Sequence, residues 1–138
     1  MKQILVDSSV VLDLFTRDPV FFASSKRTLT VWGSTHRLTI NPVIYSEVSV
    51  GFGTIESLQE ALEGAGFGMA PIPREALFLA GKVFVAYRRR GGSRTSPLPD
   101  FFIGAHAAVA GLPLLTRDPE RVRREYPTVE IVEPGLSR

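Results

Sequence analysis

Residues 4–10 have the sequence Ile-Leu-Val-Asp-Ser-Ser-Val, and the rest of the chain is interpreted outward from this stretch. A short apolar run that ends in an acid and two hydroxyl residues, with a largely apolar segment after it, is typical of a buried strand leading directly into a helix. Asp7 would then stand at the carboxyl end of the strand, where open α/β sheets bind their ligands. This stretch leaves two interpretations open: Asp7 belongs to a functional site, or Asp7 or Ser8 only caps the helix that follows.

Apolar periodicity predicts helices and strands in alternation along the remaining sequence. Helical patterns cover residues 20–34, 42–50, 55–63, 74–87, 99–110 and 120–126. Short strands are expected at residues 37–40, 114–116 and 129–132, and residues 69–73, which contain two prolines, would suit only the edge of a sheet. Helices that alternate with strands through short loops predict an α/β fold in which a parallel sheet is covered on both faces.

The length of 138 residues and the 44% hydrophobic content fit one full core, so we expect a single domain over residues 1–138. The sequence has no apolar run of about 18 residues that could span a bilayer and no secretion signal, which predicts a soluble, cytoplasmic protein without a membrane partner. The absence of cysteine excludes disulfides, thiolate zinc sites and cysteine nucleophiles. A metal ion could be bound only by oxygen atoms or by two histidines, of which His106 is expected to be a packing residue and His36 to be exposed.

Four acids fall at positions that the predicted fold could bring together. Asp7 and Asp118 each follow a predicted strand directly, so both would project from the same edge of a parallel sheet. Asp100 lies in the first turn of a buried helix, and Glu47 lies on the apolar stripe of the helix that begins at Pro42. Converging carboxylates would repel one another, so a cation would be needed to neutralise them.

Oxygen ligands without soft donors favour Mg²⁺ or Mn²⁺ over zinc. A pair of such ions about 4 Å apart can activate a water molecule and stabilise the charge that develops on a phosphodiester during in-line displacement. The four acids could supply that cage, and Ser9 and Thr116 would orient carboxylates or waters by hydrogen bonds. The pattern therefore points to metal-assisted cleavage of phosphodiester bonds.

Each of these acids also has an ordinary structural interpretation. Asp100 could be a helix N-terminal acid favoured by the helix dipole, and Asp118 before Pro119 could belong to a common turn. Glu47 is harder to dismiss, because an acid inside an apolar stripe needs a partner, which could be a buried arginine. Most of the remaining acids are interpreted as solvated or capping residues, namely Asp13, Asp18, Glu56, Glu60, Glu63, Glu75 and Glu120.

Four parts of the sequence together resemble the PIN-domain ribonucleases, and specifically the VapC-type toxins of bacterial and archaeal toxin–antitoxin pairs. They occur in the family's order over nearly the whole chain: residues 4–10 (ILVDSSV), 41–42 with 46–48 (NP and SEV), 99–107 (PDFFIGAHA) and 114–119 (LLTRDP). The resemblance implies a three-layer α/β/α sandwich with a central parallel sheet, and a Mg²⁺- or Mn²⁺-dependent endoribonuclease. It also implies a homodimer, and a VapB-like antitoxin whose tail covers the acidic pocket.

The resemblance also assigns roles to individual residues. Asp7 and Asp100 would be the principal metal ligands, and Glu47 and Asp118 would complete a catalytic acidic quartet. The supporting hydroxyl groups would be those of Ser9 and Thr116. The family often has asparagine in place of Ser9. Its members cut transfer, ribosomal or messenger RNA, and the motifs do not indicate which of these this chain would cut.

A basic, glycine-rich segment at residues 88–97 is predicted to be an exposed, mobile loop. A cluster of guanidinium groups beside an acidic metal site would bind RNA phosphates that the acids alone would repel. The candidate RNA-binding residues are Arg88, Arg89, Arg90 and Arg94. The alternative is a solvated helix end, where arginines also suit the helix dipole.

Three other functions compete with this interpretation. Aspartyl-phosphate phosphatases also have an acid after the first strand, but they need a second aspartate where this chain has Ser9. A PIN-like nuclease of RNA processing would act without an antitoxin, and a catalytically silent PIN-like module would act only by binding a partner. The intact acids argue against the silent module.

Overall fold

The computed structural model describes residues 2–95 and 98–135. Within these ranges a five-stranded parallel sheet with the strand order β3-β2-β1-β4-β5 forms the centre of the fold. The strands are β1 (Lys2–Val6), β2 (His36–Ile40), β3 (Gly68–Met69), β4 (Leu114–Leu115) and β5 (Ile131–Val132). The helices are α1 (Ser8–Phe15), α2 (Phe22–Gly33), α3 (Pro42–Val48), the 3₁₀ turn η1 (Ser49–Gly51), α4 (Ile55–Gly64), α5 (Arg74–Arg89), α6 (Pro99–Ala110) and α7 (Glu120–Glu125).

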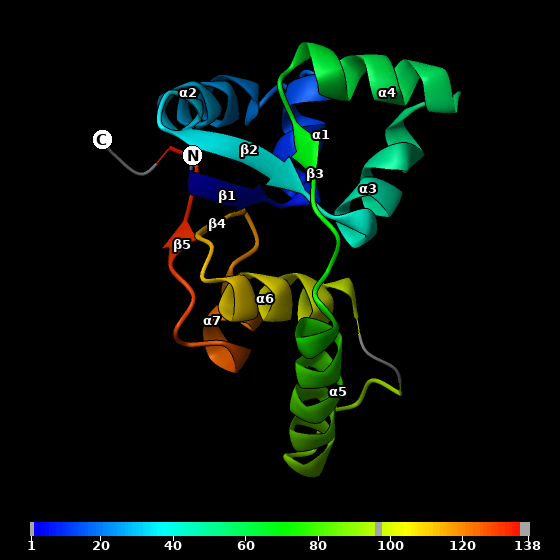
Figure 1. Cartoon of the computed structure of the whole chain (residues 1–138), viewed down its shortest axis with the longest axis vertical. Helices are drawn as coiled ribbons and strands as arrows, with labels where there is room; N and C mark the ends of the chain where they lie inside the picture. Colours follow the sequence, from blue (N-terminus) through cyan, green and yellow to red (C-terminus); the bar gives the residue numbers. More distant parts are fainter. Residues whose placement is uncertain (1, 96–97, 136–138) are drawn as a thin grey trace.

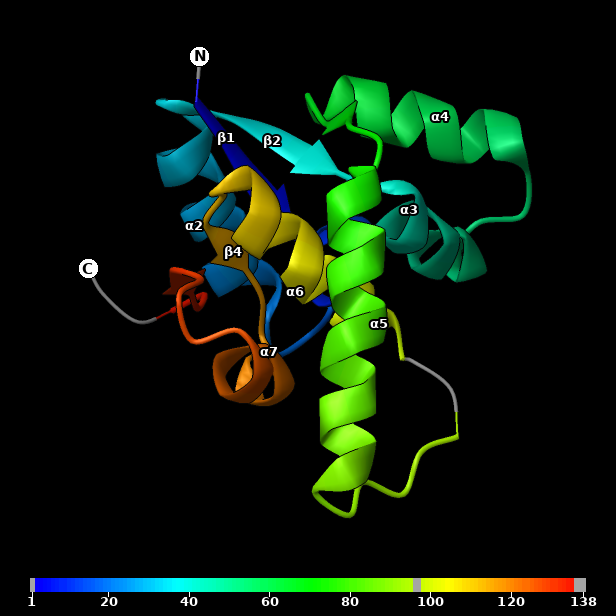
Figure 2. The same ribbon diagram turned by 60° about the horizontal axis from the view of Figure 1, so that its bottom comes forward.

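Helices cover both faces of the sheet, which confirms the predicted three-layer α/β/α sandwich (Figure 1). In Figure 1, α2 and α4 lie above β2, whereas α5, α6 and α7 lie below β1 and β4. Figure 2 shows α5 beside α6 and extending beyond it. None of the helices in the described ranges is long and apolar enough to cross a membrane.

β1 is the central strand, and this position explains its apolar composition. Ile4, Leu5 and Val6 are 0% exposed, because a strand that has neighbours on both sides and helices on both faces contacts no water. Leu5 and Val6 pair with Leu114 and Leu115 of β4, and β2 pairs with the other side of β1. Since all the strands are parallel, the segments that follow β1, β2 and β4 leave the sheet at the same edge.

Sequence signals set the beginning of the two helices that start at or near this edge. The side chain of Asn41 accepts a hydrogen bond from the amide of Ile44 at 2.9 Å, and Pro42 takes the first helical position of α3. Pro99 has the equivalent position in α6, so Asp100 lies in the first turn as predicted. The predicted starts of both helices are therefore confirmed.

Two predictions about local structure are wrong. Arg88 and Arg89 belong to the last turn of α5 and not to a loop, because the apolar stripe of α5 continues as far as Tyr87 and prolongs the helix. Asp13, expected to be solvated, is 2% exposed and is bound by Arg117. Residues 96 and 97, also assigned to the basic loop, lie outside the described residues.

Candidate active site

Asp7 lies directly after β1 and is 8% exposed. Its Oδ1 accepts a hydrogen bond from the amide of Ser8 at 2.8 Å, which caps α1. Its Oδ2 accepts from the hydroxyl of Thr116 at 2.6 Å and from that of Ser9 at 3.3 Å. Asp7 thus caps α1 with one oxygen, and its other oxygen faces the loop after β4.

Glu47 approaches the same edge of the sheet from α3 and is half-buried. Its Oε1 accepts a hydrogen bond from the hydroxyl of Ser8 at 2.9 Å. Ser8 therefore touches two carboxylates, because its amide binds Asp7 and its hydroxyl binds Glu47. The partner that Glu47 requires on an apolar stripe is this hydroxyl group, and not the buried arginine considered from the sequence.

Asp100 enters the site from α6, and its side chain is 42% exposed. The Nε atom of Arg121, in α7, lies 3.7 Å from Oδ2 of Asp100. The guanidinium group of Arg121 also lies over the rings of Tyr87 and Phe101, at 5.3 and 5.2 Å from their centroids. Packing against two aromatic rings therefore helps to set the position of Arg121 beside Asp100.

The loop after β4 brings Thr116 and Asp118 to the site. Thr116 is 1% exposed; its hydroxyl donates to Asp7 and accepts from the amide of Asp118 at 3.0 Å. The side chain of Ser9 accepts from the amide of Arg117 at 3.3 Å. Both hydroxyl groups proposed as supports thus join Asp7 to the loop that carries Asp118.

The charges of Asp7, Asp100 and Asp118 raise the pKa of other acids in the site. Burial raises the pKa of Asp7, and the negative charge of Asp118 adds to this effect, against the hydrogen bonds that Asp7 accepts. Burial also raises the pKa of Glu47, and the charges of Asp7 and Asp100 raise it further. The pKa of Asp100 is raised by burial and then by the charge of Asp7, against the attraction of Arg121. Hydrogen bonds through Ser8 and Thr116 join Asp7 to Glu47 and to the loop of Asp118, and the effect of the Asp7 charge on Asp100 agrees with a place in the same region.

The donor set of this region fits a hard divalent cation. It consists of carboxylate oxygens with hydroxyl groups beside them, as Mg²⁺ and Mn²⁺ prefer. Within residues 2–95 and 98–135, no group of three or more acidic, cysteine or histidine side chains is gathered closely enough to hold a metal ion. Instead, amide and hydroxyl groups and Arg121 contact the carboxylate oxygens of Asp7, Glu47 and Asp100.

Within the described residues, none of the four predicted RNA-binding arginines forms an ion pair or hydrogen bond with Asp7, Glu47, Asp100 or Asp118. They are exposed at the end of α5 and in the segment after it, and Figure 1 shows that α5 points away from the sheet. Arg90 forms an ion pair with Glu125 at 2.6 Å, and Arg88 donates to the carbonyl of Arg94 at 2.5 Å. Their role in binding RNA stays a prediction.

Sequence reasoning missed four residues that hold or adjoin the site. Asp13 binds the guanidinium of Arg117 with both carboxylate oxygens, at 2.7 and 3.0 Å. A signal for Asp13 was present, since it lies three residues after the buried Val10 and so on the same face of α1. The other two are Ser8, which the sequence indicated only as a possible helix cap, and Arg121, which no local pattern marks.

His106 is 2% exposed, and its Nδ1 lies 3.0 Å from Nδ2 of Asn41. Burial lowers the pKa of His106. The prediction of a packing histidine is confirmed, and the contact joins α6 to the cap of α3. His36 is half-buried beside the ring of Trp32, so the prediction that it is exposed is wrong.

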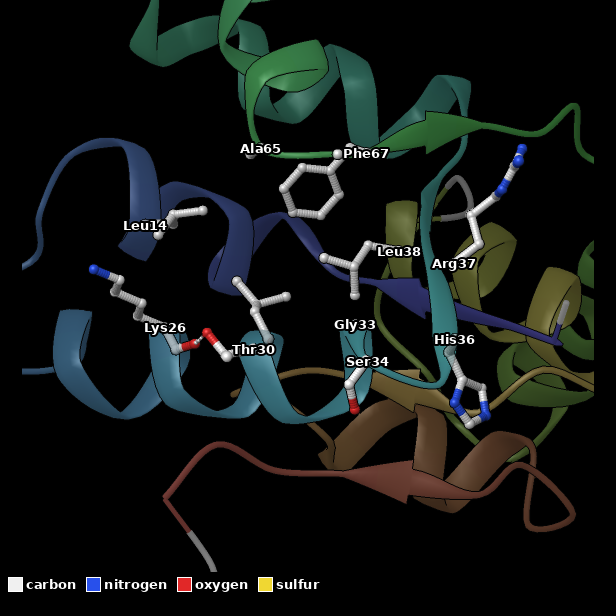
Figure 3. Close-up of a pocket in the computed structure, with 12 residues that line it drawn as sticks. Leu14, Lys26, Thr30, Gly33, Ser34, His36, Arg37, Leu38, Ala65 and Phe67 are labelled. Atoms are coloured by element: carbon white, nitrogen blue, oxygen red, sulfur yellow. Dashed lines mark hydrogen bonds between the residues drawn. The ribbon is translucent and has the colours of Figure 1, made fainter.

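A groove of about 610 Å³ lies apart from the acids, between α2, β2 and the segment from α4 to β3 (Figure 3). Leu29, Leu38 and Phe67 give it an apolar lining, and Lys26 and Arg37 add positive charge. None of the four acids lines this groove. The described residues therefore form two separate surface features, the acidic site at the carboxyl edge of the sheet and an apolar groove with basic residues.

Comparison with solved structures finds the same fold in toxin–antitoxin complexes. VapBC2 of Rickettsia felis, bound to a promoter DNA fragment, matches with a TM-score of 0.73 and 15% identity over 94% of this chain and 97% of that chain. DNA-bound VapBC of Salmonella typhimurium matches with a TM-score of 0.71 and 18% identity over 96% and 98%. A toxin–antitoxin complex of Klebsiella pneumoniae matches with a TM-score of 0.66 and 24% identity over 94% and 96%.

A comparison with curated proteins finds no match. The PIN domain family matches residues 4–125, a range that includes all four acids and both supporting hydroxyl residues. The sequence match covers most of the chain, and it agrees with the fold found independently in the solved structures. The chain belongs to the PIN domain family.

Proposed function

We propose that this protein is a Mg²⁺- or Mn²⁺-dependent endoribonuclease of the VapC type, acting as a single PIN domain and as the toxin of a toxin–antitoxin pair. One observation carries the proposal: hydrogen bonds through Ser8 and Thr116 join Asp7, which follows β1, to Glu47 of α3 and to the loop that carries Asp118, and the charge of Asp7 raises the pKa of Asp100 of α6. Buried carboxylates that repel one another reduce stability unless a cation binds them. Membership of the PIN family makes nucleic acid the substrate class that fits.

In this proposal Asp7, Glu47, Asp100 and Asp118 hold the metal. A bound divalent ion would supply a water of lowered pKa and would neutralise charge on the phosphodiester being cut. The chain's own hydroxyl groups set the directions of the carboxylates: Thr116 and Ser9 hold Oδ2 of Asp7, and Ser8 holds Oε1 of Glu47. These hydrogen bonds limit the rearrangement that binding requires.

The proposed partner is a VapB-like antitoxin, since the complexes that share the fold are described as VapBC or toxin–antitoxin complexes. The groove between α2 and β2 suits a peptide that has apolar side chains and some acidic ones, because Leu29, Leu38 and Phe67 lie beside Lys26 and Arg37. We further propose a homodimer in the cytoplasm, where the RNA substrate occurs.

The activity is tested with purified protein and a mixture of cellular RNAs. Wild-type protein should cut RNA with Mg²⁺ or Mn²⁺ and stop in EDTA, and Asp7→Asn should reduce cutting by about 100-fold or more. The matched control is Glu60→Gln, which removes the charge of an exposed acid on α4 and should change nothing. Cleavage that survives in both EDTA and Asp7→Asn would remove this assignment.

The partner is tested with the product of the gene next to the one that encodes this chain. It should bind the wild-type protein and stop RNA cleavage. Thr30→Trp, which fills the groove from the exposed face of α2, should weaken that inhibition and leave cleavage intact. A nuclease of RNA processing would show cleavage with no such inhibitor, and a silent module would show binding with no cleavage.

A further inference from the structure

The arginines that form ion pairs in the described part of the chain differ in how fully they are engaged. Arg117 donates two hydrogen bonds to Asp13, and its guanidinium lies over the ring of Phe21 at 4.0 Å. Arg90 binds Glu125 at 2.6 Å. Arg121 instead has a single contact of 3.7 Å with Asp100, the longest ion pair in the described part of the chain. Arg121 is therefore the cation in the acidic site whose partner is most easily exchanged.

Aromatic packing keeps Arg121 at the site even when its partner changes. The rings of Tyr87 and Phe101 lie under its guanidinium, and Phe101 is 0% exposed and follows Asp100 in α6. A guanidinium group has five N–H donors, and a distance of 3.7 Å is too long for a strong hydrogen bond to Asp100. With 21% of its side chain exposed, Arg121 can reach a ligand that enters beside Asp100.

We infer that Arg121 is an exchangeable counter-ion: it pairs with Asp100 in the metal-free protein and with an RNA phosphate once a divalent cation has bound the carboxylates. This inference rests on the proposed function. A divalent cation neutralises Asp100 and repels the guanidinium, so Arg121 loses its partner at the moment when a phosphate arrives. The planar fork of an arginine suits a phosphate well.

Two consequences distinguish this role from packing alone. Because Arg121 competes with the metal for Asp100, removing its charge should tighten metal binding. Because the metal frees Arg121 for RNA, removing it should weaken RNA binding when metal is present and much less when metal is absent, as the linkage between two ligands requires. A residue that only stabilises the fold would weaken both kinds of binding.

The test compares Arg121→Met with Arg124→Met. Methionine keeps the apolar stem that covers the aromatic rings, and Arg124 is an exposed residue of the same helix, so both variants lose one charge from α7. Calorimetry with Mn²⁺ alone should show roughly fivefold tighter binding for Arg121→Met than for Arg124→Met. Binding of a short single-stranded RNA is then measured in EDTA and in Ca²⁺, the latter with gel analysis to show that the RNA stays uncut.

Arg121→Met should lose roughly fivefold or more of its RNA affinity in Ca²⁺ and little in EDTA, whereas Arg124→Met should lose the same factor in both. Equal losses for Arg121→Met in the two conditions, or weaker Mn²⁺ binding, would overturn the inference. If Arg121→Met fails to fold, Arg121→Lys takes its place; it keeps the charge but not the fork, so it should bind Mn²⁺ normally and RNA more weakly in Ca²⁺. The proposed function fails instead if the wild-type protein binds no Mn²⁺, or if it binds Mn²⁺ but cuts no RNA. If the wild type binds no Mn²⁺ and Arg121→Met loses the same RNA affinity as Arg124→Met, the inference fails as well.

Discussion

At the scale of single residues, the two carboxylate oxygens of Asp7 have different tasks. Oδ1 caps α1 through the amide of Ser8, and Oδ2 accepts from Thr116 and Ser9. Hydrogen bonds of this kind stabilise the charged form, while burial opposes it, and the pKa of Asp7 is raised because burial has the larger effect. A residue can therefore cap a helix and still contribute a charged oxygen to a site.

Asp100→Asn is expected to stabilise the metal-free protein at neutral pH. The change removes a charge that repels Asp7 and Glu47, and solvent screening at a side chain that is 42% exposed limits the gain to about 1 kcal/mol. The pKa of Asp100 is raised above its ordinary value of 3.8 in the folded protein. The free energy of unfolding of the wild type therefore falls, relative to that of Asp100→Asn, as the pH rises from 3.8 through the raised pKa. Below pH 3.8 the side chain at position 100 is neutral in both the wild type and Asp100→Asn. Thermal unfolding in EDTA should therefore show equal stability for the two proteins there.

Mn²⁺ should reverse this order, because the wild type gains stability by binding the ion. Glu75 provides a matched control, since it is also an acid in the first turn of a helix. The stability difference between Glu75→Gln and the wild type should be the same in EDTA and in Mn²⁺. If the stability difference between Asp100→Asn and the wild type were also the same in EDTA and in Mn²⁺, Asp100 would not be a metal ligand.

The four acids could be proposed from the sequence because each stands next to a recognisable local pattern. Asp7 and Asp118 follow apolar strands, and Asp100 follows the proline that begins α6. The pairing of Asp13 with Arg117 could not be proposed, because 104 residues separate them and only the completed fold brings them together.

At the scale of elements, the loop of residues 116–118 is attached to the N-terminal part of the chain at successive positions. The Thr116 hydroxyl binds Asp7, the Arg117 amide binds Ser9, and the Arg117 side chain binds Asp13. Asp13 is 2% exposed and also accepts from the hydroxyl of Ser25 in α2. The ion pair between the buried Asp13 of α1 and the partly buried Arg117 thus holds the loop that carries Asp118.

Asp13→Asn is expected to lower the free energy of unfolding by about 3 kcal/mol, because it leaves the partly buried Arg117 without its charged partner. Glu133→Gln is the control, since it breaks the surface pair with Arg123 and should cost less than about 1 kcal/mol. Denaturant titration measures both values. Hydrogen exchange should also speed up at the amides of Arg117 and Asp118 in the first variant, and unchanged exchange there would contradict the holding role of Asp13.

Gly104→Ala is expected to destabilise the contact between α6 and α7. A Cβ atom at Gly104 would overlap the ring of Tyr126, whose hydroxyl donates to the carbonyl of Phe101 at 2.7 Å. Displacing this ring should cost about 1–3 kcal/mol in the free energy of unfolding. Gly81→Ala, within α5 and facing open space, should instead add up to about 1 kcal/mol, and similar effects at the two glycines would disprove the steric argument.

Helix boundaries show the same limit of sequence reasoning. The starts of α3 and α6 were predictable, because asparagine and proline act on the backbone next to them. The end of α5 was not, because Arg88 and Arg89 have the composition of a loop and are helical only through the packing of the preceding turns. Composition favoured a loop, and tertiary contacts favoured the helix.

At the scale of the whole molecule, charge is distributed between separate regions. The acids lie at the carboxyl edge of the sheet, while Arg88 and Arg89 end α5, which extends away from it (Figure 1). A long polyanion could contact both regions, with its reacting phosphate at the acids and neighbouring phosphates along α5. Arg89 is exposed and suits this role better than Arg90, which is bound to Glu125.

Arg89→Met is expected to weaken RNA binding and to flatten its salt dependence. Losing one phosphate contact to single-stranded RNA should reduce the slope of log K against log salt by about 0.7. Mn²⁺ affinity should be unchanged, because Arg89 makes no described contact with the acids. Arg27→Met, an exposed charge on α2, is the control. If the slope of log K against log salt fell equally in Arg89→Met and Arg27→Met, the effect would come from the change in net charge and not from a phosphate contact of Arg89.

The layered architecture was predictable from the alternation of helices and strands, but the strand order was not. β1 pairs with β2 and with β4, and the pairing of Leu5 with Leu114 joins residues that no local pattern connects. β3, β4 and β5 are two residues long each, so their positions follow from the helices that pack on them. The sheet is therefore specified chiefly by long-range contacts.

The position of β4 between β1 and β5 has a consequence for synthesis on the ribosome. Asp7 is made first, but its Oδ2 meets the Thr116 hydroxyl only after β4 has left the exit tunnel and inserted beside β1. A nascent chain that ends before residue 114 lacks both Thr116 and Asp118 and cannot assemble the proposed pocket. The order of the strands therefore delays assembly of the proposed pocket until most of the chain has been synthesised.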